Sequence, residues 1–185
     1  MLPTAQLGRS QAAFTRLGLG TWAIGGPWRF GWGPVDDGQS IAAIRRAVDE
    51  GINWIDTAAV YGLGHSEEVV GRALAEHTTA EGVFVATKCG RKTRSDGSPY
   101  GDLRPQSIRE ECEASLRRLR RERIDLYQIH WPDIDSGTPL EESWSTMAAS
   151  MARSDSSESS TPAAPIHPSS CSGRRAPTIA AVTPS

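Results

Sequence analysis

The sequence predicts an α/β protein in which short strands alternate with helices and the strands form a parallel sheet. From the N-terminus to about residue 147, apolar runs alternate with amphipathic segments, and this rhythm repeats four times. The apolar runs are short and rich in β-branched residues, whereas the amphipathic segments repeat their apolar residues at helical spacing. Such alternation is typical of parallel sheets, because two parallel strands need a crossover connection between them.

The first strand is predicted for the run FTRLGLG at 14–20, and a helix follows from about 37 to 50. The apolar residues that share one face of this helix are Ile41, Ile44 and Val48. Gly51 supplies a C-terminal stop, because glycine readily adopts the left-handed conformation that ends helices. The run INWID at 52–56 is then the second strand.

The second helix is expected at about 66–77, with Ser66 as its N-cap, because a serine hydroxyl can accept a hydrogen bond from the first turn. The run VFVATK at 83–88 is the third strand, since it is too short and too β-branched for a helix. The third helix begins near Pro105, a residue favoured at the first helical position, and continues to about residue 121.

The last predicted unit ends where the composition of the chain changes. IDLYQIH at 124–130 is the fourth strand, and TPLEESWSTMAA at 138–149 begins a fourth helix. In the segment 148–185, 26 of 38 residues are Ser, Thr, Pro or Ala, and the apolar periodicity disappears. Such a segment buries too little apolar surface to offset the entropy of ordering it.

Two interpretations of this segment are open. It is a disordered tail, or it is translated in a shifted reading frame, because an abrupt Ser/Ala/Pro/Arg-rich ending follows an arginine-rich chain that suggests GC-rich codons. We therefore expect a partial barrel at 1–147, as the resemblance described below implies, and a tail at 148–185 that is disordered or frame-shifted.

The bulk composition argues against several classes of partner. A formal net charge of -2 at pH 7 argues against nucleic acid, whose binding requires a strongly basic surface. The N-terminus has no basic start followed by an apolar core, and nowhere do about 18 apolar residues run together. We therefore expect a cytoplasmic protein with no membrane partner, and no motif indicates its oligomeric state.

Cysteines and lysines are few. Cys89, Cys112 and Cys171 form no C-x-x-C pair, so neither a disulfide framework nor a metal site is expected. Positive charge is carried almost wholly by arginine, and the two lysines of the chain are Lys88 and Lys92. This bias makes each lysine a candidate for a specific role.

Four polar side chains are predicted to meet at one rim of the sheet. They follow the carboxyl ends of strands, where parallel β/α proteins carry their functional groups. These rim residues are Asp56 and Tyr61 after the second strand, Lys88 at the end of the third, and His130 at the end of the fourth. Taken singly, they are explained as a turn cap, a surface aromatic, a solvated strand end and a hydrogen-bonded core histidine. Together they form a proton-transfer set.

Such a set suits carbonyl reduction, in which the carbonyl oxygen receives a proton while hydride arrives at the carbon. Tyr61 is the predicted donor, although the ordinary tyrosine pKa of about 10 is high for this task. We expect the Lys88 ammonium to lower that pKa, because its attraction for a phenolate at about 4 Å is roughly 4 kcal/mol at an effective dielectric near 20. Asp56 would keep the ammonium charged. His130 would orient the carbonyl oxygen and share its developing charge.

The motifs, taken in order, resemble the aldo/keto reductase family. The hallmark run of the family is matched by GINWIDTAAVYGLGHSEEVVGRAL, and four further stretches follow the family in the same order: LGLGTWAIGG, VATKCG, LRPQSIREECEASLRRLRRERIDLYQIHWPD and PLEESW. The resemblance covers about residues 7 to 147. It implies a TIM-type (β/α)8 barrel truncated to about four βα units with a disordered C-terminal tail, since a complete barrel needs about 250 residues.

The resemblance also implies roles for individual residues. The catalytic tetrad of the family falls on the rim residues Asp56, Tyr61, Lys88 and His130, with Tyr61 as general acid. NADPH is the expected cofactor, without a metal, and its implied contacts are Gly20, Thr21, Trp22 and Asp56. The implied substrate wall is Trp22, Trp28 and Trp131, although ordinary packing is an equal alternative for Trp28. Arg104 stands where the family would place a capping Ser or Thr.

The predicted function is NAD(P)H-dependent reduction of an aldehyde or ketone to an alcohol, with a small carbonyl compound as partner. In the family, later strands supply most of the grip on the cofactor, including its 2′-phosphate, and these strands are not found in the sequence. Two alternatives therefore remain open. They are a non-enzymatic nicotinamide-binding regulatory subunit and an inactive truncated gene product.

Two weaker motifs are rejected. GLGTWA at 18–23 fits the outline of a dinucleotide-binding turn, but IGGPWRFGWGP follows where that motif requires a helix. RRLRRER at 117–123 could be offered as a nucleic-acid patch, but it lies in the last turn of the third predicted helix, where cations favour the negative end of the helix dipole. We expect a solvated helix face there.

Overall fold

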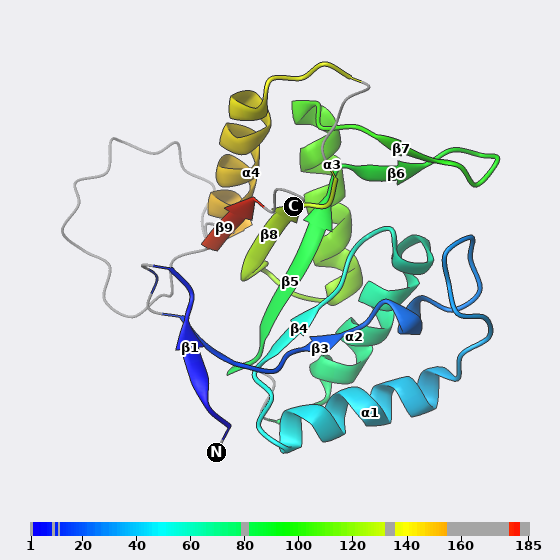
Figure 1. The fold of residues 1–185 in the computed structure, drawn as a ribbon, viewed down its shortest axis with the longest axis vertical. Helices are drawn as coiled ribbons and strands as arrows, with labels where there is room; N and C mark the ends of the chain where they lie inside the picture. The colour runs from blue at the N-terminus through cyan, green and yellow to red at the C-terminus, as the bar shows by residue number, and fades with distance from the viewer. Residues whose placement is uncertain are drawn as a thin grey trace.

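The computed structural model describes residues 2–8, 10, 12–78, 82–131, 136–154 and 178–181. Its centre is a five-stranded parallel sheet with the order β3-β4-β5-β8-β9 (Figure 1). The strands are β3 (Leu19–Gly20), β4 (Trp54–Asp56), β5 (Phe84–Cys89), β8 (Leu126–Ile129) and β9 (Thr178–Ala181). Neighbours in this sheet follow chain order and pair in parallel, which confirms the predicted α/β arrangement.

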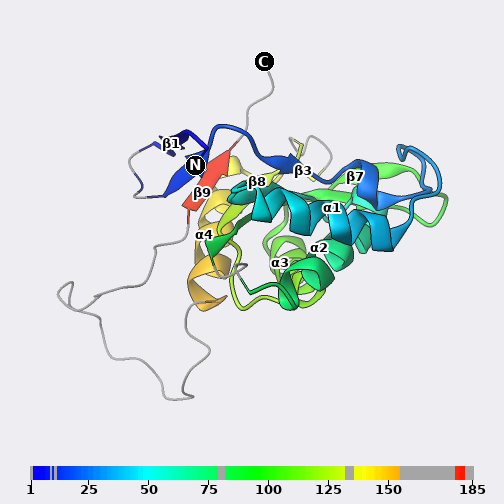
Figure 2. The ribbon, with the colours of Figure 1, turned by 90° about the horizontal axis from the view of Figure 1, so that it is seen from below.

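The helices cover one face of this sheet, as the view from below shows (Figure 2). They are α1 (Asp37–Asp49), α2 (His65–Ala75), α3 (Pro105–Leu119) and α4 (Leu140–Ser154). Apolar side chains from both layers meet between them and are fully buried, among them Ile44, Val70, Val85, Ile108, Tyr127 and Met147. Because side chains alternate along a strand, Thr87 faces the helices and Lys88 faces the other side.

The helix termini follow local signals. Asp36 caps α1 by accepting a hydrogen bond from the backbone N–H of Gln39 at 2.7 Å, and Gly51 after its end has φ 92°. Pro105 occupies the first turn of α3, and Arg104 before it makes no side-chain cap, as its departure from the family pattern suggests.

The N-cap predicted for the second helix was wrong. Gly64, with φ 102°, is the residue that precedes α2, and Ser66 lies inside the first turn. The buried Ser66 hydroxyl donates to the carbonyl oxygen of Thr21 at 2.9 Å and also meets the hydroxyls of Thr21 and Thr57. Ser66 therefore ties α2 to the ends of two strands instead of satisfying the backbone of its own helix.

The run predicted as the first strand, 14–20, contains two separate strands. Its first part, β2 (Ala13–Thr15), forms an antiparallel hairpin with β1 (Thr4–Gln6), whereas β3 joins the main sheet. Phe14 of this hairpin stacks on Phe84 with ring centroids 4.5 Å apart and meets Trp54 edge-on at 5.9 Å. Since Phe84 and Trp54 begin β5 and β4, the hairpin lies at the amino ends of the sheet, opposite the predicted rim.

A second hairpin follows β5 directly and was not predicted. It consists of β6 (Arg91–Thr93) and β7 (Pro99–Gly101), paired antiparallel (Figure 1). Strands of three residues carry too little periodicity to be recognised in a sequence. The hairpin continues from the carboxyl end of β5, so it places Arg91 and Lys92 beside the predicted rim.

Part of the predicted tail has regular structure. Helix α4 continues to Ser154, past the expected boundary at 147, because Met147 and Met151 recur at helical spacing and are both buried. Thr178–Ala181 form β9 and pair with β8. The other residues of the predicted tail, 155–177 and 182–185, lie outside the described residues, so its disorder and the frame shift stay predictions.

Cys89 and Cys112 are buried free thiols, and Cys171 lies outside the described residues. Within the described ranges, no helix has both the length and the apolar character needed to cross a membrane.

Candidate functional site

The four rim residues come from three adjacent strands and one loop. Asp56 ends β4, Lys88 is the last residue but one of β5, and His130 directly follows β8. Tyr61 begins the short turn η2 (Tyr61–Gly64) after β4. Asp56 is paired with Ala86, two residues before Lys88, so Asp56 and Lys88 face the same side of the sheet. The structure therefore brings together the four side chains that the sequence predicted.

The centre of this rim is an ion pair. Nζ of Lys88 donates to Oδ1 and Oδ2 of Asp56 at 2.7 and 2.9 Å, and to the carbonyl oxygen of Thr57 at 2.8 Å. These contacts use all three donors of the ammonium. The Lys88 side chain is 14% exposed and that of Asp56 is 30% exposed, so the pair is partly shielded from water.

Tyr61 packs between Lys88 and His130. Nζ of Lys88 lies over the phenol ring, 5.2 Å from its centroid. The His130 ring meets the same phenol edge-on, with centroids 5.6 Å apart and an interplanar angle of 88°. Among the described residues, none forms a hydrogen bond with the Tyr61 hydroxyl. This hydroxyl is therefore available to a ligand.

The prediction that Lys88 lowers the pKa of Tyr61 was wrong. Burial, with a further contribution from the Asp56 carboxylate, raises the pKa of Tyr61 to about 12. The physical reason is that Asp56 neutralises Lys88 and that the ammonium faces the ring instead of the hydroxyl. Tyr61 is therefore a neutral phenol at physiological pH.

His130 is a neutral imidazole at physiological pH. Burial, together with the positive charges of Lys88 and Arg91, lowers the pKa of His130 to about 4. Its backbone N–H donates to the carbonyl oxygen of Cys89 at 2.9 Å, which fixes the end of β8 against the end of β5. A neutral imidazole still carries one N–H donor, as the predicted role requires.

The residues with implied cofactor contacts lie beside Asp56. Gly20 is paired with Asp56, and Thr21 donates through its N–H and its hydroxyl to the Asp56 carbonyl oxygen, both at 3.0 Å. Thr21 is fully buried, so its side chain positions the end of β4. Trp22 is 45% exposed. A 3-10 turn, η1 (Ala23–Gly25), follows instead of an α-helix, in agreement with the rejection of the dinucleotide-binding motif.

The three tryptophans of the implied substrate wall differ in their surroundings. Trp22 meets Trp32 edge-on at 6.2 Å, and Trp131 is 53% exposed with the Arg91 guanidinium 5.6 Å from its ring centroid. Trp28 packs edge-on against Phe30, and its buried Nε1 meets no hydrogen-bond partner in the described segments. Trp22 and Trp131 therefore present apolar surface outward from β3 and β8.

Sequence reasoning missed a buried polar group behind the rim. Glu67 is fully buried, accepts a hydrogen bond from Thr87 at 2.5 Å, and pairs with Nε of Arg118 at 2.7 Å. Arg121 likewise pairs with Asp125 and donates to the Val83 carbonyl oxygen. The expectation of a solvated face for 117–123 therefore holds for Arg117 and Arg120, which are exposed, but not for Arg118 and Arg121. The signal that sequence could have offered was the polar Ser-Glu pair on the inward face of α2.

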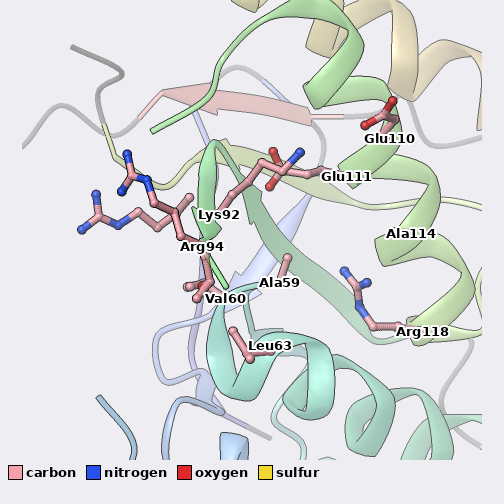
Figure 3. Close-up of a pocket in the computed structure, with 11 residues that line it drawn as sticks. Ala59, Val60, Leu63, Lys92, Arg94, Glu110, Glu111, Ala114 and Arg118 are labelled. Carbon is pink, nitrogen blue, oxygen red and sulfur yellow. The ribbon is translucent and has the colours of Figure 1, made fainter. Parts of the chain in front are cut away.

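A cavity of about 430 Å³ lies outside the rim, between β6, α3 and the loop before α2 (Figure 3). Figure 3 shows Lys92 extending from β6 toward α3, where its Nζ donates to Ser107 at 3.3 Å. Glu111 lines the same cavity, and its carboxylate oxygens accept hydrogen bonds from the Gly90 N–H, each at 3.2 Å. No rim residue lines this cavity, although Arg91 does.

In the part of the chain that the structure describes, no group of three or more His, Cys, Asp or Glu side chains is arranged to hold a metal ion.

Comparison with known proteins finds similar sequences in one enzyme family. The sequence profile described as "Aldo/keto reductase family" matches residues 16–152. The aldo-keto reductase YhdN of Bacillus subtilis is 45% identical over 133 residues, which cover 72% of this chain and 38% of that protein. The NADH-specific methylglyoxal reductase of Escherichia coli is 43% identical over 139 residues, which cover 69% of this chain and 41% of that protein.

Solved structures agree with the sequence matches. The glycerol dehydrogenase AKR11B4 from Gluconobacter oxydans superimposes with a TM-score of 0.69 at 49% identity, over 79% of this chain and 44% of that one. The aldo-keto reductase AKR11C1 from Bacillus halodurans gives a TM-score of 0.66 at 30% identity, over 79% and 45%. These neighbours are (β/α)8 barrels, which confirms the predicted fold class. The chain spans about two fifths of the length of the curated relatives that it matches.

Proposed function

Because this chain belongs to the aldo/keto reductase family, we propose that its rim carries out the proton-transfer half of a carbonyl reduction that uses NADH or NADPH. The net reaction converts an aldehyde or ketone, a reduced nicotinamide and a proton into an alcohol and an oxidised nicotinamide. The Escherichia coli relative is named as NADH-specific, so the expected preference for NADPH is not carried into this proposal.

One observation carries the proposal. A neutral phenol, a neutral imidazole and a neutralised ammonium–carboxylate pair converge at one rim, with Tyr61 between Lys88 and His130. A phenol and an imidazole N–H are the hydrogen-bond donors that a carbonyl oxygen needs as negative charge develops on it.

The residues present fit a nicotinamide. Gln128 is paired with Lys88, so it faces the same side of the sheet, and its buried Oε1 has no hydrogen-bond partner among the described residues. That oxygen can accept a hydrogen bond from the carboxamide of the ring, and Trp22 offers it an exposed apolar face. When bound, the reduced nicotinamide supplies the hydride that the carbonyl carbon receives.

The proton comes from Tyr61. Although its pKa is raised to about 12, the alkoxide that forms on reduction is a stronger base than a phenolate, so the transfer runs downhill. The O–H bond of Tyr61 breaks as the new O–H bond of the alcohol forms. The phenolate then recovers its proton from the solvent, while Nζ of Lys88, 5.2 Å from the ring centroid, stays paired with Asp56.

The test follows NADH and NADPH oxidation with a small aldehyde, using the full chain and the Tyr61→Phe variant. We expect Tyr61→Phe to lower kcat by about 100-fold or more, because a general acid contributes about 10²–10⁴-fold, while the cofactor Kd stays unchanged. Tyr100→Phe is the matched control, since Tyr100 lies in β7 against Arg94. Equal rates for Tyr61→Phe and the full chain would refute the proposal.

Two other outcomes distinguish the alternatives. If the chain binds nicotinamide cofactor without turnover, it is a nicotinamide-binding regulatory subunit and not an enzyme. If it neither binds cofactor nor melts cooperatively, the chain is an inactive fragment by itself.

A further inference from the structure

Arg91 stands at the rim and has no charged partner in the part of the chain that the structure describes. It follows Lys88 by three residues, at the first position of β6, and its guanidinium lies 5.6 Å from the ring centroid of Trp131. Trp131 directly follows His130, and Arg91 is one of the two cations that lower the pKa of His130. Arg91 is therefore within electrostatic reach of the position where Tyr61 and His130 would hold a carbonyl group.

No carboxylate among the described residues neutralises the charge of Arg91. Arg91 forms no ion pair with a carboxylate in any of the described segments, whereas Lys88 is paired with Asp56. Since His130 and Tyr61 are neutral at physiological pH, Arg91 gives the rim a net positive charge.

Stacking on Trp131 also orients the guanidinium. A guanidinium that lies over an indole ring keeps its N–H edge free, and this edge matches the two oxygens of a carboxylate or phosphate. Trp131 is 53% exposed, so a ligand at the rim can reach both side chains. An unpaired, pre-oriented guanidinium beside an apolar ring is the recognition chemistry of an anionic organic molecule.

We infer that Arg91 is a specificity-determining residue that selects carbonyl substrates bearing an anionic group, a carboxylate or a phosphate, at the end remote from the carbonyl. This inference rests on the proposed function. The anionic group binds the guanidinium edge of Arg91, the body of the substrate packs on Trp131, and the carbonyl oxygen points to Tyr61 and His130.

Arg94, which directly follows the other end of β6, provides a matched control. Its guanidinium lies 4.7 Å from the Tyr100 ring centroid and donates to the Pro99 carbonyl oxygen at 3.2 Å. These contacts hold it within the β6–β7 hairpin. Arg94 has the same charge as Arg91 and also lies over an aromatic ring, but that ring belongs to Tyr100 and not to Trp131.

The kinetic test compares 4-formylbenzoate with its methyl ester, which differ in charge but little in shape. The ratio of their kcat/KM values is measured for the full chain, Arg91→Gln, Arg91→Lys and Arg94→Gln. We expect Arg91→Gln to lower the ratio by about tenfold, which is the size of one charge-assisted hydrogen bond, and Arg94→Gln to leave it unchanged. Arg91→Lys keeps the charge without the planar edge and should give an intermediate ratio. An unchanged ratio in Arg91→Gln overturns the inference.

A binding test works without turnover, so it separates this inference from the proposed function. The chain has six tryptophans, and the indole N–H signal that is missing in Trp131→Phe identifies Trp131 in a ¹⁵N NMR spectrum. We expect 4-formylbenzoate to shift this signal in the full chain and in Arg94→Gln but not in Arg91→Gln, and the methyl ester to leave it unmoved. Equal shifts with acid and ester, or a shift that persists in Arg91→Gln, overturn the inference.

A phosphate group of the cofactor is the alternative ligand for the Arg91 guanidinium. If Arg91→Gln weakens NADH and NADPH binding while the acid-to-ester ratio stays constant, Arg91 belongs to the cofactor site and the substrate inference is wrong.

Discussion

The ammonium of Lys88 lies 2.7 Å from Oδ1 and 2.9 Å from Oδ2 of Asp56, and its remaining donor reaches the Thr57 carbonyl oxygen. Asp56→Asn therefore leaves a largely shielded cation without its counter-charge. We expect this variant to lose about 1–3 kcal/mol of unfolding free energy, less than for a fully buried pair because Asp56 is partly exposed. Urea unfolding at neutral pH measures the loss.

The matched control is the double variant Asp56→Asn with Lys88→Met, which removes the orphaned charge as well. It should recover at least half of the lost stability, because the cost lies in the unpaired ammonium and not in the missing carboxylate. A double variant no more stable than Asp56→Asn would show that the pair does not behave as a coupled unit.

His130 should titrate with a pKa of about 4 in an NMR titration of its ring protons. Because this pKa lies below the unfolded value of about 6.5, the stability it contributes is present above about pH 6.5 and is lost as the pH falls toward 4. The difference in unfolding free energy between the full chain and His130→Gln should therefore shrink by about 1–3 kcal/mol over that interval. Arg91→Gln should move the pKa of His130 upward. A histidine that titrates at its ordinary value contradicts this description of the rim.

The stability contributed by Glu111 should depend on pH in the opposite direction from that contributed by His130. Burial raises the pKa of Glu111 to about 7, although the Gly90 N–H, Lys92 and Ser107 all favour the carboxylate. Its folded form therefore holds a proton longer than its unfolded form, and stability falls as the pH rises from about 4.5 to 7. We expect Glu111→Gln, which stays neutral and keeps an acceptor for Gly90, to exceed the full chain by about 1–3 kcal/mol at about pH 8 and to match it near pH 4.5.

Glu110→Gln is the control for this comparison, since Glu110 lies on the exposed side of α3 and exposed substitutions change stability by less than about 0.5 kcal/mol. If Glu111→Gln shows the same difference at both pH values, its effect comes from packing and not from titration.

Gly71 lies where α2 packs tightly against the end of α3. A Cβ added there would lie 2.3 Å from the carbonyl oxygen of Arg118, and backbone atoms cannot yield as a flexible side chain can. Gly71→Ala should therefore lower the unfolding free energy by about 1–3 kcal/mol, despite the better helix propensity of alanine. Gly82→Ala, whose Cβ would meet nothing within 4 Å, should be nearly neutral in the same thermal unfolding experiment. Equal melting temperatures for the two variants would contradict the close packing.

The sequence located the rim because strand ends are easy to recognise. Asp56, Lys88 and His130 each terminate an apolar run, and parallel strands bring their carboxyl ends to one edge. The end of α1 and the start of α3 followed from Gly51 and Pro105, whose effects are local.

The effect of Lys88 on the pKa of Tyr61 could not be predicted from the sequence. Whether Lys88 faces the hydroxyl or the ring of Tyr61 depends on η2, where Gly62 and Leu63 both adopt positive φ values of 61° and 56°. The burial of Glu67 and Arg118 depends on how α2 packs against α3, and it is invisible in a run of charged residues. Both hairpins were missed because strands of three residues have no period of their own.

The order of the strands in the sheet, β3-β4-β5-β8, is also the order in which a ribosome makes them. Each strand that carries a rim residue can pair with one already synthesised, without waiting for a later partner. At about 5–20 residues per second, the interval between making Asp56 and making His130 is roughly 4–15 s. The four rim residues are thus made in sequence order, and each can take its place at the rim as soon as the strand that carries or precedes it pairs.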